Sequence, residues 1–203
     1  MRNNENGRSM VEMLGVLAII GVLSAGGLAG YSKAMFKHKL NSTMEQITMV
    51  VTNIRTMYGS QGNYDGLSNA NAVSLGAIPT IMGTGAALTS PFKGDVYIQM
   101  ATTNSAAILE DNDTSHATAF LVTYENLPKE ACIALATADF GSGAGSGFIG
   151  TEAFSTSSEA APSDATDSAA GHVVGTNEGK ALDMATALSK CTSEDNAVSW
   201  KFY

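Results

Sequence analysis

The sequence predicts an α+β fold in which one long N-terminal helix packs on an antiparallel β-sheet head. Three observations lead to this fold class: an uncharged apolar run near the N-terminus, an apolar stripe at helical spacing that continues it, and short β-rich runs in the C-terminal half. The 203 residues are enough for one domain with its own core and an N-terminal appendage.

The first part of the predicted helix carries no charge between Glu12 and Lys33. These residues, MLGVLAIIGVLSAGGLAGYS, are long enough at about 1.5 Å per residue to cross a bilayer core of about 30 Å. A Sec signal peptide is the alternative, with Arg2 and Arg8 in its basic region and cleavage near Ala25. The carboxylate of Glu12 at the edge of the run argues against a signal peptide, because an ionisable group is costly there.

The helical pattern continues beyond the apolar run as far as Tyr58. Apolar residues recur at spacings of three and four, at Leu40, Met44, Ile47, Val51, Ile54 and Tyr58. The polar residues between them are expected to point away from this stripe, namely Asn41, Glu45, Thr48, Thr52 and Arg55. Gly59 and Gly62 end the predicted helix. It therefore has an apolar half, residues 10–32, and an amphipathic half, residues 33–58, which should pack on a domain.

The remaining residues, 59–203, are expected to form the globular head. Three runs have the apolar and β-rich composition of strands: residues 95–100, 119–124 and 197–203. A helix opened by Asn126-Leu127-Pro128 should run to about Ala138, and residues 180–190 predict a second one. Residues 141–178 are rich in Gly, Ser, Ala and Thr and predict a loop-rich stretch.

Charge is unevenly divided between the predicted helix and the head. Residues 1–58 carry six basic and three acidic side chains, whereas residues 59–203 carry five basic and sixteen acidic ones. An acidic head repels nucleic acid phosphates, and no basic patch is visible in its sequence. We therefore expect no nucleic-acid binding by the head.

The chain has two cysteines, Cys132 and Cys191, both in the C-terminal half. An even, minimal count behind an export-like segment predicts one disulfide formed outside the cytoplasm. Two unrelated buried thiols are the alternative. A bridge would close the region 132–191, and a loop of about 60 residues corresponds to roughly 4 kcal/mol of stabilisation.

Patterns that would indicate catalysis or a metal site are weak. The glycines of residues 141–147 do not fit G-x-G-x-x-G. Asp111 and Asp113 begin like a calcium loop, but His116 stands where that loop requires glycine. The histidines are far apart without paired zinc ligands, and no G-x-S-x-G occurs. We expect neither an enzyme nor a bound metal or cofactor.

The segment GRSMVEMLGVLAIIGVL resembles the N-terminal signal of type IV prepilins. That signal is a short polar leader ending in Gly, followed by a segment with Glu at its fifth position and an unbroken apolar stretch. Here the glycine is Gly7, the new N-terminus would be Arg8, and the fifth residue is Glu12. The resemblance implies that a prepilin peptidase removes the leader, residues 1–7, on the cytoplasmic side of the membrane. It also implies methylation of the new amino group, although Arg8 departs from the apolar residue common at that position.

The C-terminal half resembles type IVb pilins, which include toxin-coregulated and conjugative pilus subunits. The runs LGAIPTIM, SPFKGDVYI and AFLVTYENLPKEACIAL, followed by the late Cys191, are similar to that family's order of loop, strands, cysteine-bearing helix and closing cysteine. The resemblance implies the αβ-roll of type IV pilins, with residues 8–58 as its long helix and a C-terminal disulfide.

As a function, the resemblance implies a structural subunit of a type IVb-like pilus, an extracellular fimbrium that can serve cell adhesion. The precursor would lie in the inner membrane with its head on the periplasmic side. Its partners would be copies of itself, the prepilin peptidase, and an assembly machinery of platform protein, ATPase and secretin. Glu12 is expected to pair with the amino group of Arg8 in a neighbouring subunit. The alternatives are a type II secretion pseudopilin, a minor pilin and a Sec-secreted soluble binding protein.

Overall fold

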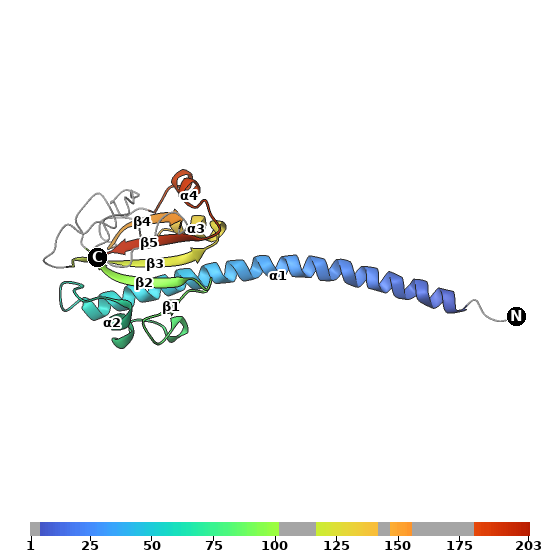
Figure 1. Ribbon diagram of the computed structural model, residues 1–203, viewed down its shortest axis with the longest axis horizontal. Helices are drawn as coiled ribbons and strands as arrows, with labels where there is room; N and C mark the ends of the chain where they lie inside the picture. The colour runs from blue at the N-terminus through green and yellow to red at the C-terminus, as the bar shows by residue number, and fades with distance from the viewer. Residues whose placement is uncertain (1–4, 102–116, 142–146, 156–180) are drawn as a thin grey trace. The chain divides into compact units, whose positions relative to one another are not determined.

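The computed structural model of the chain describes residues 5–101, 117–141, 147–155 and 181–203, with side chains from Met10 onward (Figure 1). The chain divides into two units, Met1–Asn41 and Ser42–Tyr203. One helix, α1, spans Glu5–Tyr58 and contributes to both units. The predicted single helix is therefore confirmed, and it ends at the predicted residue.

In the first unit, α1 is apolar and exposed around its circumference. Its large aliphatic residues keep between 52% (Ile20) and 74% (Val22) of their surface exposed: Met10, Val11, Met13, Leu14, Val16, Leu17, Ile19, Ile20, Val22, Leu23 and Leu28. Among the described residues, the helical stretch Met10–Tyr58 is long and apolar enough to cross a membrane, by length and composition. These large aliphatic side chains of the apolar half are therefore exposed in the described structure.

In the second unit, the apolar stripe of α1 forms part of the core. Ile47 and Ile54 are completely buried and Val51 is nearly so. At the end of the helix the ring of Tyr58 lies 5.7 Å from that of Tyr64, which lies 4.8 Å from Phe120 on the sheet. The expectation that the amphipathic half packs on a domain is confirmed.

The head contains a five-stranded antiparallel sheet with the strand order β1-β2-β3-β5-β4 (Figure 1). The strands are β1 (Leu88–Thr89), β2 (Asp95–Ala101), β3 (Ala119–Leu127), β4 (Phe148–Ser155) and β5 (Asn196–Phe202). β5, the last in sequence, lies between β3 and β4 and pairs with both. The C-terminal strand is thus an interior strand of the sheet, and all seven of its residues are buried.

The strands differ from the prediction in three places, the first of which is β1, a strand that the sequence analysis did not predict. β3 continues to Leu127, so the following helix begins at Lys129 with Pro128 as its N-cap rather than at Asn126. The loop-rich prediction for residues 141–178 is wrong over β4, which pairs along its length with β5. The rest of that stretch, at 142–146 and 156–178, lies outside the described residues.

Short helices flank the sheet: α2 (Asn69–Ser74), the 3₁₀-helix η1 (Thr80–Met82), α3 (Lys129–Ala136) and α4 (Met184–Lys190). α2, which was not predicted, and α4, which begins later than predicted, each have a side-chain N-cap, whereas α3 has none. Ser68 accepts a hydrogen bond from the backbone N–H of Asn71 at the start of α2, and Asp183 caps α4. The sequence analysis did not predict α2 or η1.

Candidate functional site

The disulfide joins the two short helices of the C-terminal region. Cys132 lies in α3 and Cys191 is the C-cap of α4, with their sulfur atoms 1.98 Å and their Cα atoms 5.9 Å apart. Both residues are completely buried. A second link lies nearby, because the backbone N–H of Leu182 donates to the carbonyl of Ala136 at 3.0 Å. The predicted pairing is confirmed, and it holds α4 against α3.

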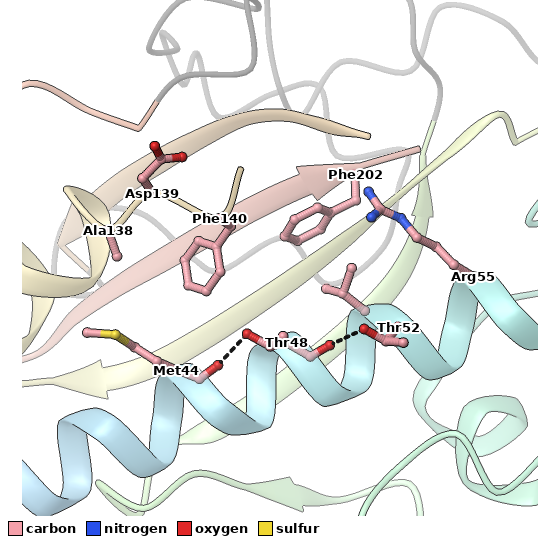
Figure 2. Close-up of a pocket in the computed structure, with 9 residues that line it drawn as sticks. Met44, Thr48, Thr52, Arg55, Ala138, Asp139, Phe140 and Phe202 are labelled. Carbon is pink, nitrogen blue, oxygen red and sulfur yellow. Dashed lines mark hydrogen bonds between the residues drawn. The ribbon is translucent and has the colours of Figure 1, made fainter. Parts of the chain in front are cut away.

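The chain segment that follows α3 forms one wall of a pocket of about 360 Å³ (Figure 2). We call it the Phe140 pocket; its lining residues are Met44, Thr48, Val51, Thr52, Arg55, Ala138, Asp139, Phe140 and Phe202. Figure 2 shows Phe140 pointing toward α1, with Arg55 at one end of the pocket and Ala138 and Asp139 at the other. The pocket thus has an apolar middle and a cation, Arg55, at one end, whereas the carboxylate of Asp139 points away from α1.

The threonine hydroxyls on the α1 side of the pocket already donate hydrogen bonds within the helix. The hydroxyl of Thr48 donates to the carbonyl of Met44 at 2.9 Å, and that of Thr52 donates to the carbonyl of Thr48 at 2.8 Å (Figure 2). Both hydroxyl protons are therefore used within the helix, and the methyl groups remain available for contact. An apolar side chain can cover this wall without stripping these hydroxyls of their acceptors.

Arg55 occupies a position that the helical pattern did not predict. Its guanidinium carbon lies 5.4 Å from the ring centroid of Phe202, a cation–π distance. Burial lowers the pKa of Arg55, while nearby Tyr64 and Tyr203 act in the opposite direction. Arginine nevertheless stays protonated because its ordinary pKa is so high. The pocket therefore has a permanent positive charge at this end.

The expectation that Arg55 points away from the stripe is wrong, since it is half-buried and lies against the sheet. Four residues after Val51, it is one turn further along the same face. The spacing of four from Val51 indicates that Arg55 lies on the buried face of the helix. The sequence analysis assigned it to the solvent face because its side chain is polar. Gly147 shows how tightly the guanidinium is enclosed: a Cβ added there would collide with Arg55 and with the carbonyl oxygen of Tyr203.

The predicted processing and assembly residues all lie on α1. Gly7 and Arg8 fall within its helical backbone, and Glu12 is exposed. Cleavage after Gly7 and pairing of Glu12 with another subunit remain predictions.

The described residues hold no cluster of three or more metal-ligating side chains. His38 is exposed on α1. The other residues considered for calcium or zinc, Asp111, Asp113, His116 and His172, lie outside the described ranges.

Comparison with known proteins identifies relatives of this chain. The Bundlin family profile matches residues 33–194. The major structural subunits of the bundle-forming pilus from Escherichia coli O127:H6 and O111:H- are each 28% identical over 142 residues, which is 69% of this chain and 68% of the relative.

Two solved structures are also similar. A type IVb pilin from Salmonella typhi has 16% identity and a TM-score of 0.45, with 79% of this chain and 97% of that one covered. The type IV pilin TcpA of the Vibrio cholerae El Tor biotype has 21% identity and a TM-score of 0.48, with 82% and 99% covered. Since the profile match includes four-fifths of the sequence, from the amphipathic half of α1 to the residues after Cys191, this chain belongs to the Bundlin family.

Proposed function

We propose that this chain is a structural subunit of a type IVb-like pilus, polymerised through its N-terminal helix into an extracellular filament. The observation that carries the proposal is the Bundlin profile match over residues 33–194. The two Escherichia coli relatives are themselves major structural subunits of a pilus. A filament of this kind can serve cell adhesion.

The exposed apolar half of α1 supports polymerisation through this helix. Apolar surface in water costs about 25 cal/mol per Å², so a helix exposed on every side requires lipid or other helices around it. Lipid of the inner membrane would supply that cover before assembly, and neighbouring copies of α1 would supply it in the filament. A Cβ added at any of its five glycines would meet no atom within 4 Å: Gly15, Gly21, Gly26, Gly27 and Gly30. Their small size therefore favours contacts outside the chain.

The prepilin-like motif at Gly7, Arg8 and Glu12 supports a processing step. The proposed precursor consists of a leader, residues 1–7, a long helix, residues 8–58, and a head, residues 59–203. A prepilin peptidase cuts after Gly7 on the cytoplasmic side, and the amino group of Arg8 is then methylated. The head lies on the periplasmic side, where the disulfide of the region 132–191 forms. Platform protein, assembly ATPase and secretin then export the growing filament.

Glu12 has a physical role in this scheme. Cleavage creates a positively charged amino group at Arg8, which would lie among apolar helices in the filament. The carboxylate of Glu12 on a neighbouring subunit can neutralise it, because a charge buried without a partner is strongly unfavourable. Docking at the filament end would then transfer the carboxylate of Glu12 from the lipid to a contact with this positive charge.

Electron microscopy of cells tests the proposed function. Cells with the gene, cells from which it is deleted, and the complemented deletion should be compared by negative staining, with an antibody against the head as a label. Filaments that carry the label, disappear on deletion and return on complementation are expected. Unchanged, unlabelled filaments after deletion would contradict the role as a major structural subunit.

A further inference from the structure

The helix α1 carries a group of lysines directly after its apolar half. Three lysines follow the uncharged run within seven residues: Lys33, Lys37 and Lys39. Lys33 and Lys37 are exposed and lie one turn apart on the same side of the helix, whereas Lys39 is half-buried. No acidic residue occurs in residues 13–44, so this stretch has a net charge of +3 with histidine neutral. We call the three lysines the lysine band.

The position of the lysine band along α1 matches the surface of a membrane that contains the apolar half. With a rise of about 1.5 Å per residue, Lys33 lies about 3 Å and Lys37 about 9 Å beyond Tyr31, near the end of the uncharged run. The headgroup layer on each side of the hydrocarbon core is about 5–7 Å thick. Lysine can also lay its aliphatic stem along apolar surface while its ammonium group stays in the polar layer. Both ammonium groups can therefore reach the depth of the headgroups.

The residues just before the lysine band suit the edge of the hydrocarbon core. Tyr31 is 63% exposed, and tyrosine is enriched at membrane interfaces, where its ring can meet hydrocarbon and its hydroxyl can meet the headgroups. The hydroxyl of Ser32 donates to the carbonyl of Leu28 at 3.0 Å. Ser32 can therefore leave water with its hydroxyl donor satisfied, and the cations of the band follow directly.

The charge of the band has the sign that an anionic membrane surface attracts. Each lysine close to such a surface is drawn to it, and the attraction falls off within a Debye length. The head has the opposite character, because residues 59–203 carry five basic and sixteen acidic side chains and are repelled by the same surface. The lysine band is thus the part of the chain whose charge and depth both match the phosphate groups of anionic lipids.

We propose that the lysine band binds the phosphate groups of anionic phospholipids, and that it gathers these lipids around the subunit before assembly. The proposal rests on the proposed function, in which the subunit is inserted in a membrane before it enters the filament. Transfer into the filament then breaks these contacts, so anionic lipid stabilises the subunit in the membrane. An acidic surface of a second copy also has the matching sign, but lipid already surrounds the helix at this depth and requires no second copy.

Spin-labelled lipids measure this contact on the full chain reconstituted in bilayers. Lipid beside an inserted helix is motionally restricted, and electron spin resonance gives the restricted fraction separately for labelled phosphatidylglycerol and phosphatidylcholine. The association constant should favour phosphatidylglycerol about fivefold, as expected for one cation beside each bound lipid. Lys33→Gln combined with Lys37→Gln should bring the ratio of the two constants close to one. Raising the salt from about 0.1 M to about 1 M should also lower the ratio, because the Debye length shortens from about 10 Å to about 3 Å.

Two matched variants assign the effect to the band. Lys33→Arg combined with Lys37→Arg keeps both positive charges and should keep the preference for phosphatidylglycerol. Lys93→Gln combined with Lys129→Gln removes two exposed lysines of the head and should leave the preference unchanged. This head variant has the same net charge as the glutamine variant of the band, so a difference between them reports the position of the charges.

The outcomes separate the lipid contact from the proposed function. An unchanged preference in the Lys33 and Lys37 glutamine variant would overturn the contact, as would an equal loss in the head variant. A filament yield that falls in the band variant while the preference stays would also overturn it and would indicate pairing with another copy. Cells without filaments whose purified chain keeps the preference would refute the function alone. Absence of any restricted lipid would refute both, because the apolar half would then not be inserted.

Discussion

The guanidinium of Arg55 lies over the ring of Phe202, with 5.4 Å between the guanidinium carbon and the ring centroid. This contact joins the amphipathic half of α1 to the interior strand β5. Phe202 is 2% exposed, so the cation meets a ring that water scarcely reaches. Under these conditions a cation–π contact is worth about 1–2 kcal/mol.

Arg55→Ala should therefore lower the free energy of unfolding by about 1–3 kcal/mol, because the packed stem of the side chain is lost together with its charge. Arg55→Lys should retain part of this stability. Trp200 is the only tryptophan and is completely buried, so its fluorescence during guanidinium unfolding in detergent reports on the head. An unchanged midpoint for Arg55→Ala would show that the contact does not stabilise the fold.

Gly147 and Gly76 have nearly the same backbone conformation but different surroundings. Comparing an alanine substitution at each position therefore separates the cost of a steric clash from the cost of backbone strain. Gly147 and Gly76 have φ angles of 75° and 74°, but only at Gly147 would an added Cβ meet other atoms. Gly76→Ala should cost about 1 kcal/mol, since a left-handed backbone is unfavourable for alanine. Gly147→Ala should cost about 1–3 kcal/mol more, because Arg55 and the carbonyl of Tyr203 must move. Equal losses in the same fluorescence assay would contradict the close enclosure of Arg55.

Replacing both Cys132 and Cys191 by alanine should lower the free energy of unfolding by about 4 kcal/mol. The loop closed by the bridge spans a sequence separation of 59, and the chain-entropy relation gives this magnitude. Alanine is preferable to serine here, since both positions are fully buried and a hydroxyl would be desolvated. Free thiols that react with an alkylating agent before any reduction of the exported protein would show that the bridge is absent.

The long helix was predictable because its signal is strong and local. Gly59 follows the last helical residue, Tyr58, as the pattern requires, and the stripe at Ile47, Val51 and Ile54 is buried. Arg55 escaped the same reasoning because a polar residue is assigned to solvent by default. The aliphatic stem of Arg55 packs in the head, and its guanidinium lies over the ring of Phe202 in β5. The helical pattern alone does not indicate this contact, because it requires a strand that is distant in sequence.

The strands show which elements of the sheet can be recognised from the local sequence pattern and which cannot. β2 has a recognisable apolar run, whereas β4 places Thr151 and Glu152 in its middle and follows a glycine-rich stretch. Every residue of β4 is nevertheless buried, although the strand lies at the edge of the sheet and pairs with β5 alone among the described strands. The Phe140 pocket was equally beyond the sequence, since it joins α1 to residues some 90 positions away. Partners so distant in sequence are set by tertiary pairing rather than by periodicity.

Mass spectrometry of the mature protein should show Arg8 as its first residue. The Gly7 boundary precedes Glu12 and the apolar run, so cleavage there leaves the whole of the apolar half attached to the head. A mass increase of one methyl group on the N-terminal peptide is expected if the amino group is modified. A mature N-terminus at Ala25 or Gly26 would instead establish a cleaved signal peptide and leave the head without its apolar helix.

Glu12→Ala should leave a stable, membrane-resident protein that forms filaments poorly. The head folds on the part of α1 from Ile47 to Tyr58, so the loss of a carboxylate about 35 residues earlier should not unfold it. The apolar helix becomes more favourable in lipid, since an ionisable group there costs about 3 kcal/mol. The amino group of Arg8 on the adjoining subunit loses its partner, so sheared filament yield should fall sharply for Glu12→Ala and less for Glu12→Asp. Immunoblots of the membrane fraction should show that the amount of protein in the membrane is undiminished. Normal pili from the alanine variant would contradict the pairing and show that Glu12 is only a carboxylate at the membrane interface.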